Sequence, residues 1–292
     1  MVNVKVWLLA SRPKTLPASI VPVIVGTAMA YGDGKYHFLS AIVCLFCSVM
    51  IQIGTNISND YFDFKKGTDT GERIGPTRVT QAGLIPPSTV KLSFIIVFFV
   101  AGLASLYLVY RGGLPVVIIG VLSIVSGILY TAGPKPLGYI GLGEIFVLFF
   151  FGPVAVAGTY YVQSLKWGLY SILIGFSVGL LSVAILAVNN YRDIEQDKKT
   201  GKHTLAVLFG RTFAQYEYII SIVLAALIPA FTSIIIKAHY GVLFSCLIVI
   251  LAFPCMKTIL TKTDGVSLNN ALASTGKLLI IFSILFSIGY IL

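Results

Sequence analysis

Charged residues are scarce in this sequence. Only 11% of its 292 residues are Asp, Glu, Lys or Arg, whereas 57% are hydrophobic. Soluble domains carry about 25% charged residues. A soluble fold cannot bury so much apolar surface, so the composition excludes a soluble protein and predicts an integral membrane protein.

Cysteine is scarce as well. All four cysteines lie within apolar segments, and Cys44 and Cys47 form a C-x-x-C pair with no histidine or second cysteine pair near them. We therefore interpret them as packing residues rather than zinc ligands. No cleavable signal peptide is evident, because the apolar stretch before Arg12 is too short for one.

Long apolar runs are abundant. A membrane-spanning helix needs roughly 20 apolar residues, whereas a barrel strand needs only about 9–11, so the runs predict helices. We predict a single transmembrane domain over residues 1–292 with nine spans and no soluble appendage. The predicted spans are residues 14–32, 38–58, 90–110, 114–132, 142–163, 167–190, 214–236, 240–261 and 273–292.

The net charge of +10 is explained by the positive-inside rule rather than by nucleic-acid binding. Counted over the predicted topology, the loops on the amino-terminal side hold sixteen basic residues and the opposite loops hold four, Lys35, Arg111, Lys166 and Lys237. This asymmetry predicts a cytoplasmic amino end, an external carboxyl end and a location in the cell inner or plasma membrane. No basic patch interleaved with aromatic residues indicates a nucleic-acid partner.

Two polar segments follow apolar runs and match each other. "NDYFDFKKGTD" begins at Asn59, and "NNYRDIEQDKKTG" begins at Asn189. Five identities recur at a constant offset of 130 residues, so we predict a parallel 4+4 internal repeat, with halves of about 1–135 and 136–265, plus one added helix. The matched pairs are Asn59/Asn189, Tyr61/Tyr191, Asp63/Asp193, Thr70/Thr200 and Gly71/Gly201.

These two segments, with the first continued to Glu72, hold seven of the eleven acidic residues. If each helix continues through its segment, residues three, four and seven apart share a face, which stacks amides beneath carboxylates. Carboxylate and amide oxygens suit Mg²⁺ or Ca²⁺ rather than zinc, and Mg²⁺ in proteins commonly also binds substrate phosphates. The two stacks are Asn56, Asn59, Asp60 and Asp63, and Asn189, Asn190, Asp193 and Asp197.

We therefore predict a central cavity, open to the cytoplasm, in which two acidic faces hold divalent cations around a diphosphate. Ionisable groups at the membrane are costly and usually functional. Neighbouring cationic side chains would contact the remaining phosphate charge. These are Lys65, Lys66, Arg73, Arg78, Lys198 and Lys202.

The two segments resemble the signatures of the UbiA-type intramembrane prenyltransferases, N-D-x-x-D-x-x-x-D after the second span and D-x-x-x-D after the sixth. Here these read "NDYFD" and "DIEQD". One position departs, because the final Asp of the first signature falls on Gly67; Asp69 is the expected substitute. The resemblance covers essentially the whole chain and implies Asn59, Asp63, Asp193 and Asp197 as catalytic residues. It implies Asn59, Asp60, Asp63, Asp69, Asp193 and Asp197 as ligands of two or more Mg²⁺ ions, with Mn²⁺ as the alternative.

Within that family the sequence most resembles the branch that transfers a polyprenyl group to 1,4-dihydroxy-2-naphthoate, with loss of CO₂ and diphosphate, in menaquinone synthesis. "SRPKTLPASIVPVIVG" at Ser11 and "LYTAGPKPLGYIGLGE" at Leu129 support this, and Gly67 is itself typical of the branch. The implied substrates are a polyprenyl diphosphate, drawn from membrane lipid, and an aromatic acid. Beyond the cations above, the implied contacts are Asn56, Asn189, Asn190, Arg12, Lys14, Tyr130 and Lys135.

Two alternatives stay open at this point. The acceptor in the runner-up interpretation is 4-hydroxybenzoate or a related aromatic precursor. A different class, an ion-coupled secondary transporter, also has repeats and intramembrane acids, although its sites tend toward the middle of the bilayer. The oligomeric state and the length of the isoprenoid tail are not indicated by the sequence.

Overall fold

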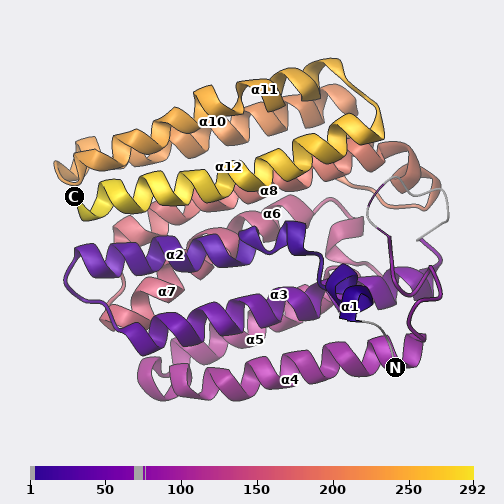
Figure 1. The fold of residues 1–292 in the computed structure, drawn as a ribbon, viewed down its shortest axis with the longest axis horizontal. Helices are drawn as coiled ribbons and strands as arrows, with labels where there is room; N and C mark the ends of the chain where they lie inside the picture. Colours follow the sequence, from indigo (N-terminus) through magenta and orange to yellow (C-terminus); the bar gives the residue numbers. More distant parts are fainter. Residues whose placement is uncertain (1–3, 69–74, 76) are drawn as a thin grey trace.

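A computed structural model describes residues 4–68, 75 and 77–292, and within these the regular elements are all helices (Figure 1). The elements are α1 (Val4–Ser11), η1 (Pro13–Thr15), α2 (Pro17–Gly32), α3 (Phe38–Lys66), α4 (Pro87–Gly112), α5 (Leu114–Leu129), η2 (Leu137–Tyr139), α6 (Gly143–Phe149), η3 (Phe150–Val154), α7 (Ala155–Ser164), α8 (Leu169–Lys199), α9 (Leu205–Phe209), α10 (Arg211–Ile236), η4 (Tyr240–Leu247), α11 (Ile248–Thr261) and α12 (Gly265–Ile291). The predicted all-α class is therefore confirmed.

Among the described residues, seven helices are long and apolar enough to cross a membrane, or eight if the bent pair at the amino end is one span. Each of the nine predicted spans falls on helix, but the segment at 114–132 forms a helix of only 16 residues, α5. The count of nine spans and the 4+4 repeat both stay predictions.

The bend near the amino end positions part of the site. Residues 4–15 and α2 meet at 56°, and Arg12, in the left-handed conformation (φ 50°), separates α1 from the short helix that starts at Pro13. Proline lacks the N–H that would continue a helix, so Pro13 and Pro17 each begin a new one. The break turns the Arg12 side chain toward α3, where it donates a hydrogen bond to the Asn56 carbonyl oxygen at 3.3 Å.

Two long helices, α3 and α8, organise the bundle (Figure 1). α3 packs against α4, α5 and α2, while α8 packs against α10, α12 and the α6–α7 segment. Small residues allow α8 to pack closely against α6, since a Cβ added at Gly179 would lie 2.2 Å from the Leu148 carbonyl oxygen. Each long helix is thus held firmly by its neighbours.

Both long helices continue through the polar segments, as the shared-face argument requires. α3 runs to Lys66 and α8 to Lys199. α3 ends at Gly67, whose φ of 69° is the left-handed conformation in which glycine commonly terminates a helix. This explains glycine at the position where the family signature has Asp.

Candidate active site

One cavity of about 420 Å³ runs between α3 and α8. Asp63 lines it from α3, and Asp193 and Asp197 line it from α8. Both acidic segments therefore face one shared hollow, as predicted. The cavity extends along α3 to Cys44 and Cys47, where its wall is apolar.

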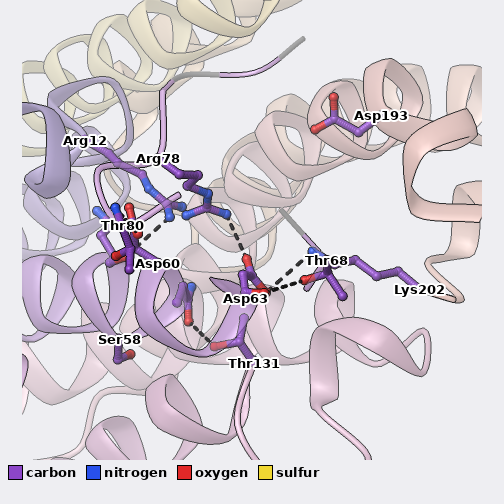
Figure 2. A network of polar contacts seen from close by, with 12 residues as sticks. Arg12, Ser58, Asp60, Asp63, Thr68, Arg78, Thr80, Thr131, Asp193 and Lys202 are labelled. Atoms are coloured by element: carbon purple, nitrogen blue, oxygen red, sulfur yellow. Dashed lines mark hydrogen bonds and ion pairs between the residues drawn. The ribbon is translucent and has the colours of Figure 1, made fainter. Parts of the chain in front are cut away.

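Asp63 is the centre of a polar network at the end of α3 (Figure 2). Its Oδ2 accepts a hydrogen bond from Arg78 Nη2 at 2.9 Å, and its Oδ1 accepts one from the Tyr139 hydroxyl. Lys202 Nζ lies 3.6 Å from the same Oδ1 and 4.6 Å from the centre of the Tyr139 ring. Asp63 itself is only 1% exposed, so its charge is balanced by cations from outside α3.

Asp193, on α8, is paired with an arginine in a similar way. Arg192 donates to both of its carboxylate oxygens, at 2.7 Å from Nε and 2.6 Å from Nη2. The same guanidinium donates from Nη1 to Asn269 Oδ1 on α12 at 2.7 Å. Asp197, one helical turn further along α8, is also buried. The Asp193 carboxylate is therefore held in a fixed position by Arg192.

The four predicted asparagines all line the cavity, each with a different partner. Asn59 accepts from the Thr131 hydroxyl at 2.8 Å. Asn56 donates to the Ser11 carbonyl oxygen at 2.9 Å. Asn189 accepts from Arg192, and Asn190 donates to Glu144 Oε1 at 2.7 Å.

Asp60 has a different environment from the one predicted. Its two oxygens accept hydrogen bonds from the backbone N–H groups of Val79 and Thr80, each at 3.0 Å, and it is not among the residues that line the cavity. A carboxylate that satisfies two backbone donors anchors the segment that carries Arg78. This arrangement favours a structural task for Asp60 over the predicted role as a metal ligand.

The predicted cationic and aromatic contacts divide into two groups. Arg12, Arg78, Lys202 and Tyr130 line the cavity. Four predicted lysines are exposed and lie outside its lining: Lys14, Lys65, Lys135 and Lys198. Lys66 donates to the Gly133 carbonyl oxygen at 2.8 Å instead. Asp69 and Arg73 lie outside the described residues.

Sequence reasoning missed several residues of the site. Tyr139 and Thr131 both contact the first acidic segment from the stretch "LYTAGPKPLGYIGLGE", in which only Tyr130 and Lys135 were singled out. Arg192 is not among the predicted contacts, although it stands inside the second acidic segment. Glu144, the last residue of the stretch "LYTAGPKPLGYIGLGE", is not among the predicted site residues either. Its contact with Asn190 joins two helices and carries no sequence signal of its own.

The donor set suits a hard divalent cation, since Asp63, Asp193, Asp197 and Asn59 offer only oxygen. Nevertheless, within the part of the chain that the structure describes, no three acidic, histidine or cysteine side chains are grouped closely enough to hold a metal ion by themselves. Mg²⁺ in proteins commonly uses one or two carboxylates with phosphate oxygens completing its shell. The residues thus fit a cation that binds together with a diphosphate.

The deeper part of the cavity is apolar and aromatic. Phe146 and Phe150 line it with their rings stacked, 5.9 Å between centroids and 8° between planes. A cluster of Cys47, Leu108, Val116 and Val162, all in the lining, lies at the far end. The cavity therefore joins a polar, charged mouth to a channel suited to a hydrocarbon chain.

Comparison with known proteins gives consistent matches. The model of the UbiA prenyltransferase family matches residues 19–284. A 1,4-dihydroxy-2-naphthoate octaprenyltransferase of Escherichia coli is 36% identical over 98% of this chain and 95% of its own, and one of Haemophilus influenzae is 39% identical over 78% and 77%.

The fold matches solved structures as well. A UbiA homolog from Archaeoglobus fulgidus bound to GPP and Mg²⁺ superposes with a TM-score of 0.73 at 17% identity, covering 98% of this chain and 99% of the homolog. The membrane-capable helices agree with a multi-pass membrane protein. The chain therefore belongs to the UbiA prenyltransferase family, and it is a membrane-embedded prenyltransferase.

Proposed function

We propose that this protein transfers a polyprenyl group from a polyprenyl diphosphate to 1,4-dihydroxy-2-naphthoate, releasing diphosphate and CO₂ and forming demethylmenaquinol. The observation that carries the proposal is that Asp63 and Asp193, on two long helices, line one cavity whose far end is apolar. The names of the similar bacterial enzymes support the naphthoate over 4-hydroxybenzoate as acceptor. Family membership favours the enzyme over a transporter.

The diphosphate would bind at the polar mouth. Arg78 and Lys202, which flank Asp63, supply positive charge there. Arg12, which donates to the Asn56 carbonyl oxygen on α3, also lines the cavity. Asn59, Asp63, Asp193 and Asp197 would hold two or more Mg²⁺ ions, or Mn²⁺ in their place. When bound, the metal would neutralise charge that develops on the departing diphosphate.

The chain's own residues would control the rest of the reaction. The bond between the allylic carbon and the diphosphate oxygen breaks, and the cationic side chains stabilise the leaving anion. The apolar wall that includes Phe146 and Phe150 keeps water from the allylic cation. The ring carbon that bears the carboxylate forms the new carbon–carbon bond, and its bond to the carboxyl carbon breaks to release CO₂ and restore aromaticity.

The proposed setting follows from the charge asymmetry of the loops. The chain acts as one transmembrane domain of residues 1–292, in a cell inner or plasma membrane, with its amino end in the cytoplasm. The mouth of the cavity, at the carboxyl ends of α3 and α8, then faces the cytoplasm, where a water-soluble aromatic acid arrives. The isoprenoid tail enters from the bilayer.

The test is an assay of the purified protein in detergent with one prenyl diphosphate and either 1,4-dihydroxy-2-naphthoate or 4-hydroxybenzoate. We expect prenylated product, CO₂ and diphosphate with the naphthoate, abolition by EDTA and recovery with added Mg²⁺. Exclusive prenylation of 4-hydroxybenzoate would overturn the acceptor, and activity unaffected by EDTA would overturn the metal requirement.

A further inference from the structure

Two adjacent asparagines of α8 are held by side chains of opposite charge. Asn189 Oδ1 accepts a hydrogen bond from Arg192 Nη2 at 2.8 Å. Asn190 Nδ2 donates one to Glu144 Oε1 at 2.7 Å. Both asparagines line the cavity, whereas Arg192 and Glu144 do not, so the charged groups act from behind the wall.

The charged partners fix which end of each amide faces the cavity. A guanidinium can only donate, so it engages the Asn189 carbonyl and leaves the amide NH₂ for a ligand. A carboxylate can only accept, so it engages the Asn190 NH₂ and leaves the carbonyl oxygen. The wall therefore presents a hydrogen-bond donor at Asn189 and an acceptor at the next residue.

Glu144 is buried and is held in position. It is the second residue of α6, where the helix dipole favours negative charge. The preceding residue, Gly143, fits tightly, because a Cβ there would lie 2.9 Å from the Tyr130 hydroxyl and 3.6 Å from Leu186 Cδ2. The backbone beside Glu144 thus has little room to move.

The surroundings of Asn190 suit an aromatic ring better than a hydrated cation. Along α8 it lies one turn from Asp193 and about 10 Å from Asp197 at about 1.5 Å per residue. Leu186, one turn deeper on the same helix, lines the cavity, as does Tyr130. The stacked rings of Phe146 and Phe150 supply a flat apolar wall in the same cavity.

We propose that Glu144 is a positioning residue of an acceptor subsite: it turns the Asn190 carbonyl oxygen toward a ring hydroxyl of the aromatic acceptor. Arg192 turns the Asn189 NH₂ toward the neighbouring carboxylate of the same ring. A hydrogen-bond acceptor and a donor on two adjacent residues are complementary to a hydroxyl and a carboxylate on adjacent ring carbons. The 1-hydroxyl and 2-carboxylate of the naphthoate are adjacent in this way, whereas those of 4-hydroxybenzoate lie across the ring. This inference rests on the proposed function.

The test measures binding, so that an inactive variant remains informative. The intrinsic fluorescence of 1-hydroxy-2-naphthoate reports its Kd for the purified protein, and competition gives the Kd of 2-naphthoate, which lacks the hydroxyl. We expect the wild type to prefer the hydroxylated ligand by about tenfold, which corresponds to about 1.4 kcal/mol. In Glu144→Leu the ratio of the Kd of 2-naphthoate to that of 1-hydroxy-2-naphthoate falls to about one, while the Kd of 2-naphthoate changes little.

A swapped pair separates positioning from simple structural support. Asn190→Asp alone places two carboxylates against each other and abolishes the preference. Asn190→Asp combined with Glu144→Gln restores it, because the glutamine then donates to one oxygen of the aspartate and the other faces the cavity. Glu195→Gln, an exposed change on the same helix, is the matched control and leaves the preference intact.

Three results would overturn the proposal: an unchanged preference in Glu144→Leu, no recovery in the swapped pair, or a shift in the Mg²⁺ concentration for half-maximal activity of Glu144→Gln with the ligand preference intact. The last result would place the Asn190 oxygen on a metal ion instead. Failure of the proposed function would appear separately, as wild-type protein that makes no prenylated naphthoate.

Discussion

Arg78 and Asp63 form a buried ion pair, with 2.9 Å between Nη2 and Oδ2 and side chains that are 7% and 2% exposed. The arginine comes from the segment after the first acidic motif, and the aspartate from the end of α3. The same segment is fixed to α3 a second time, through the hydrogen bonds of Val79 and Thr80 to Asp60. Asp63, which pairs with Arg78, and Asp60, which anchors the backbone of the same segment, are therefore neighbours on α3.

Removing the arginine should destabilise the fold as well as the site. Arg78→Met leaves the Asp63 carboxylate buried without its main cation, and breaking a buried pair from one side costs about 3–5 kcal/mol. We expect a clear fall in the melting temperature of the detergent-solubilised protein, together with loss of turnover. The matched control is Arg211→Met, whose ion pair with Glu195 is 3.1 Å long but exposed and worth about 0–1 kcal/mol. Equal destabilisation by both changes would contradict the assignment.

Asp60 and Asp63 should respond differently to the same change. Asp60→Asn leaves one backbone N–H without an acceptor, which costs about 1–3 kcal/mol. We expect a lower melting temperature but a nearly unchanged Mg²⁺ requirement in the protein that remains folded. Asp63→Asn should raise the Mg²⁺ requirement strongly. Titration of activity with Mg²⁺, together with thermal unfolding, separates the two; an increased Mg²⁺ requirement in Asp60→Asn would restore it as a metal ligand.

More of the fold than of the site could be predicted from the sequence, and the reason is physical. Hydrophobic run length is a local property, so the helices could be predicted from it. The continuation of α3 to Lys66 and of α8 to Lys199, through their polar motifs, lies beyond the apolar runs and could only be assumed. The motif spacing placed Asp63 and Asp193 in one cavity. The break at Arg12 and the short α5 depend on prolines and packing, which run length does not report.

Contacts between distant segments could not be predicted in the same way. Asp60 and Asp63 share a helix face by spacing, but only the folded position of residues 78–80 decides that one carboxylate anchors backbone while the other pairs with Arg78. The Tyr139 hydroxyl donates to Asp63 from 76 residues further along the chain, and no helical or strand periodicity in the sequence indicates this contact. Positive charge near a motif also proved a poor guide, since Lys65 and Lys198 project outward and Lys202 does not.

Asp193 should be required for turnover beyond its contribution to stability. Asp193→Asn keeps the side chain's shape and leaves Arg192 its contacts to Asn189 and Asn269. Loss of one preorganised oxyanion-hole donor typically costs about 10²–10³ in kcat, and we expect an effect of similar size from the loss of a metal-binding carboxylate. We expect a decrease of that order in the folded protein, measured by single-turnover product formation at saturating Mg²⁺. The melting temperature should fall as well, because the change leaves Arg192, whose side chain is 1% exposed, without its anionic partner.

The control for this change is Asp264→Asn, which alters an exposed carboxylate that caps α12 by accepting from the Ser267 N–H at 2.9 Å. Because Asn caps a helix about as well as Asp, it should change stability little and leave turnover intact. Wild-type turnover in Asp193→Asn would remove this residue from the proposed centre.

The apolar end of the cavity should limit the length of donor that can bind. Asp63 and Cys47 are 16 residues apart on α3, so the channel follows about 24 Å of that helix. Gly158 lines it, and a Cβ there would lie 3.4 Å from Ile119 Cδ1, so a larger side chain must project into the channel. Gly158→Leu should therefore raise the KM for long prenyl diphosphates much more than for a ten-carbon donor. Gly102→Leu is the matched control, since a Cβ at Gly102 meets nothing within 4 Å and the residue is outside the cavity lining. A KM that rises equally for short and long donors in Gly158→Leu would mean that the tail does not follow this path.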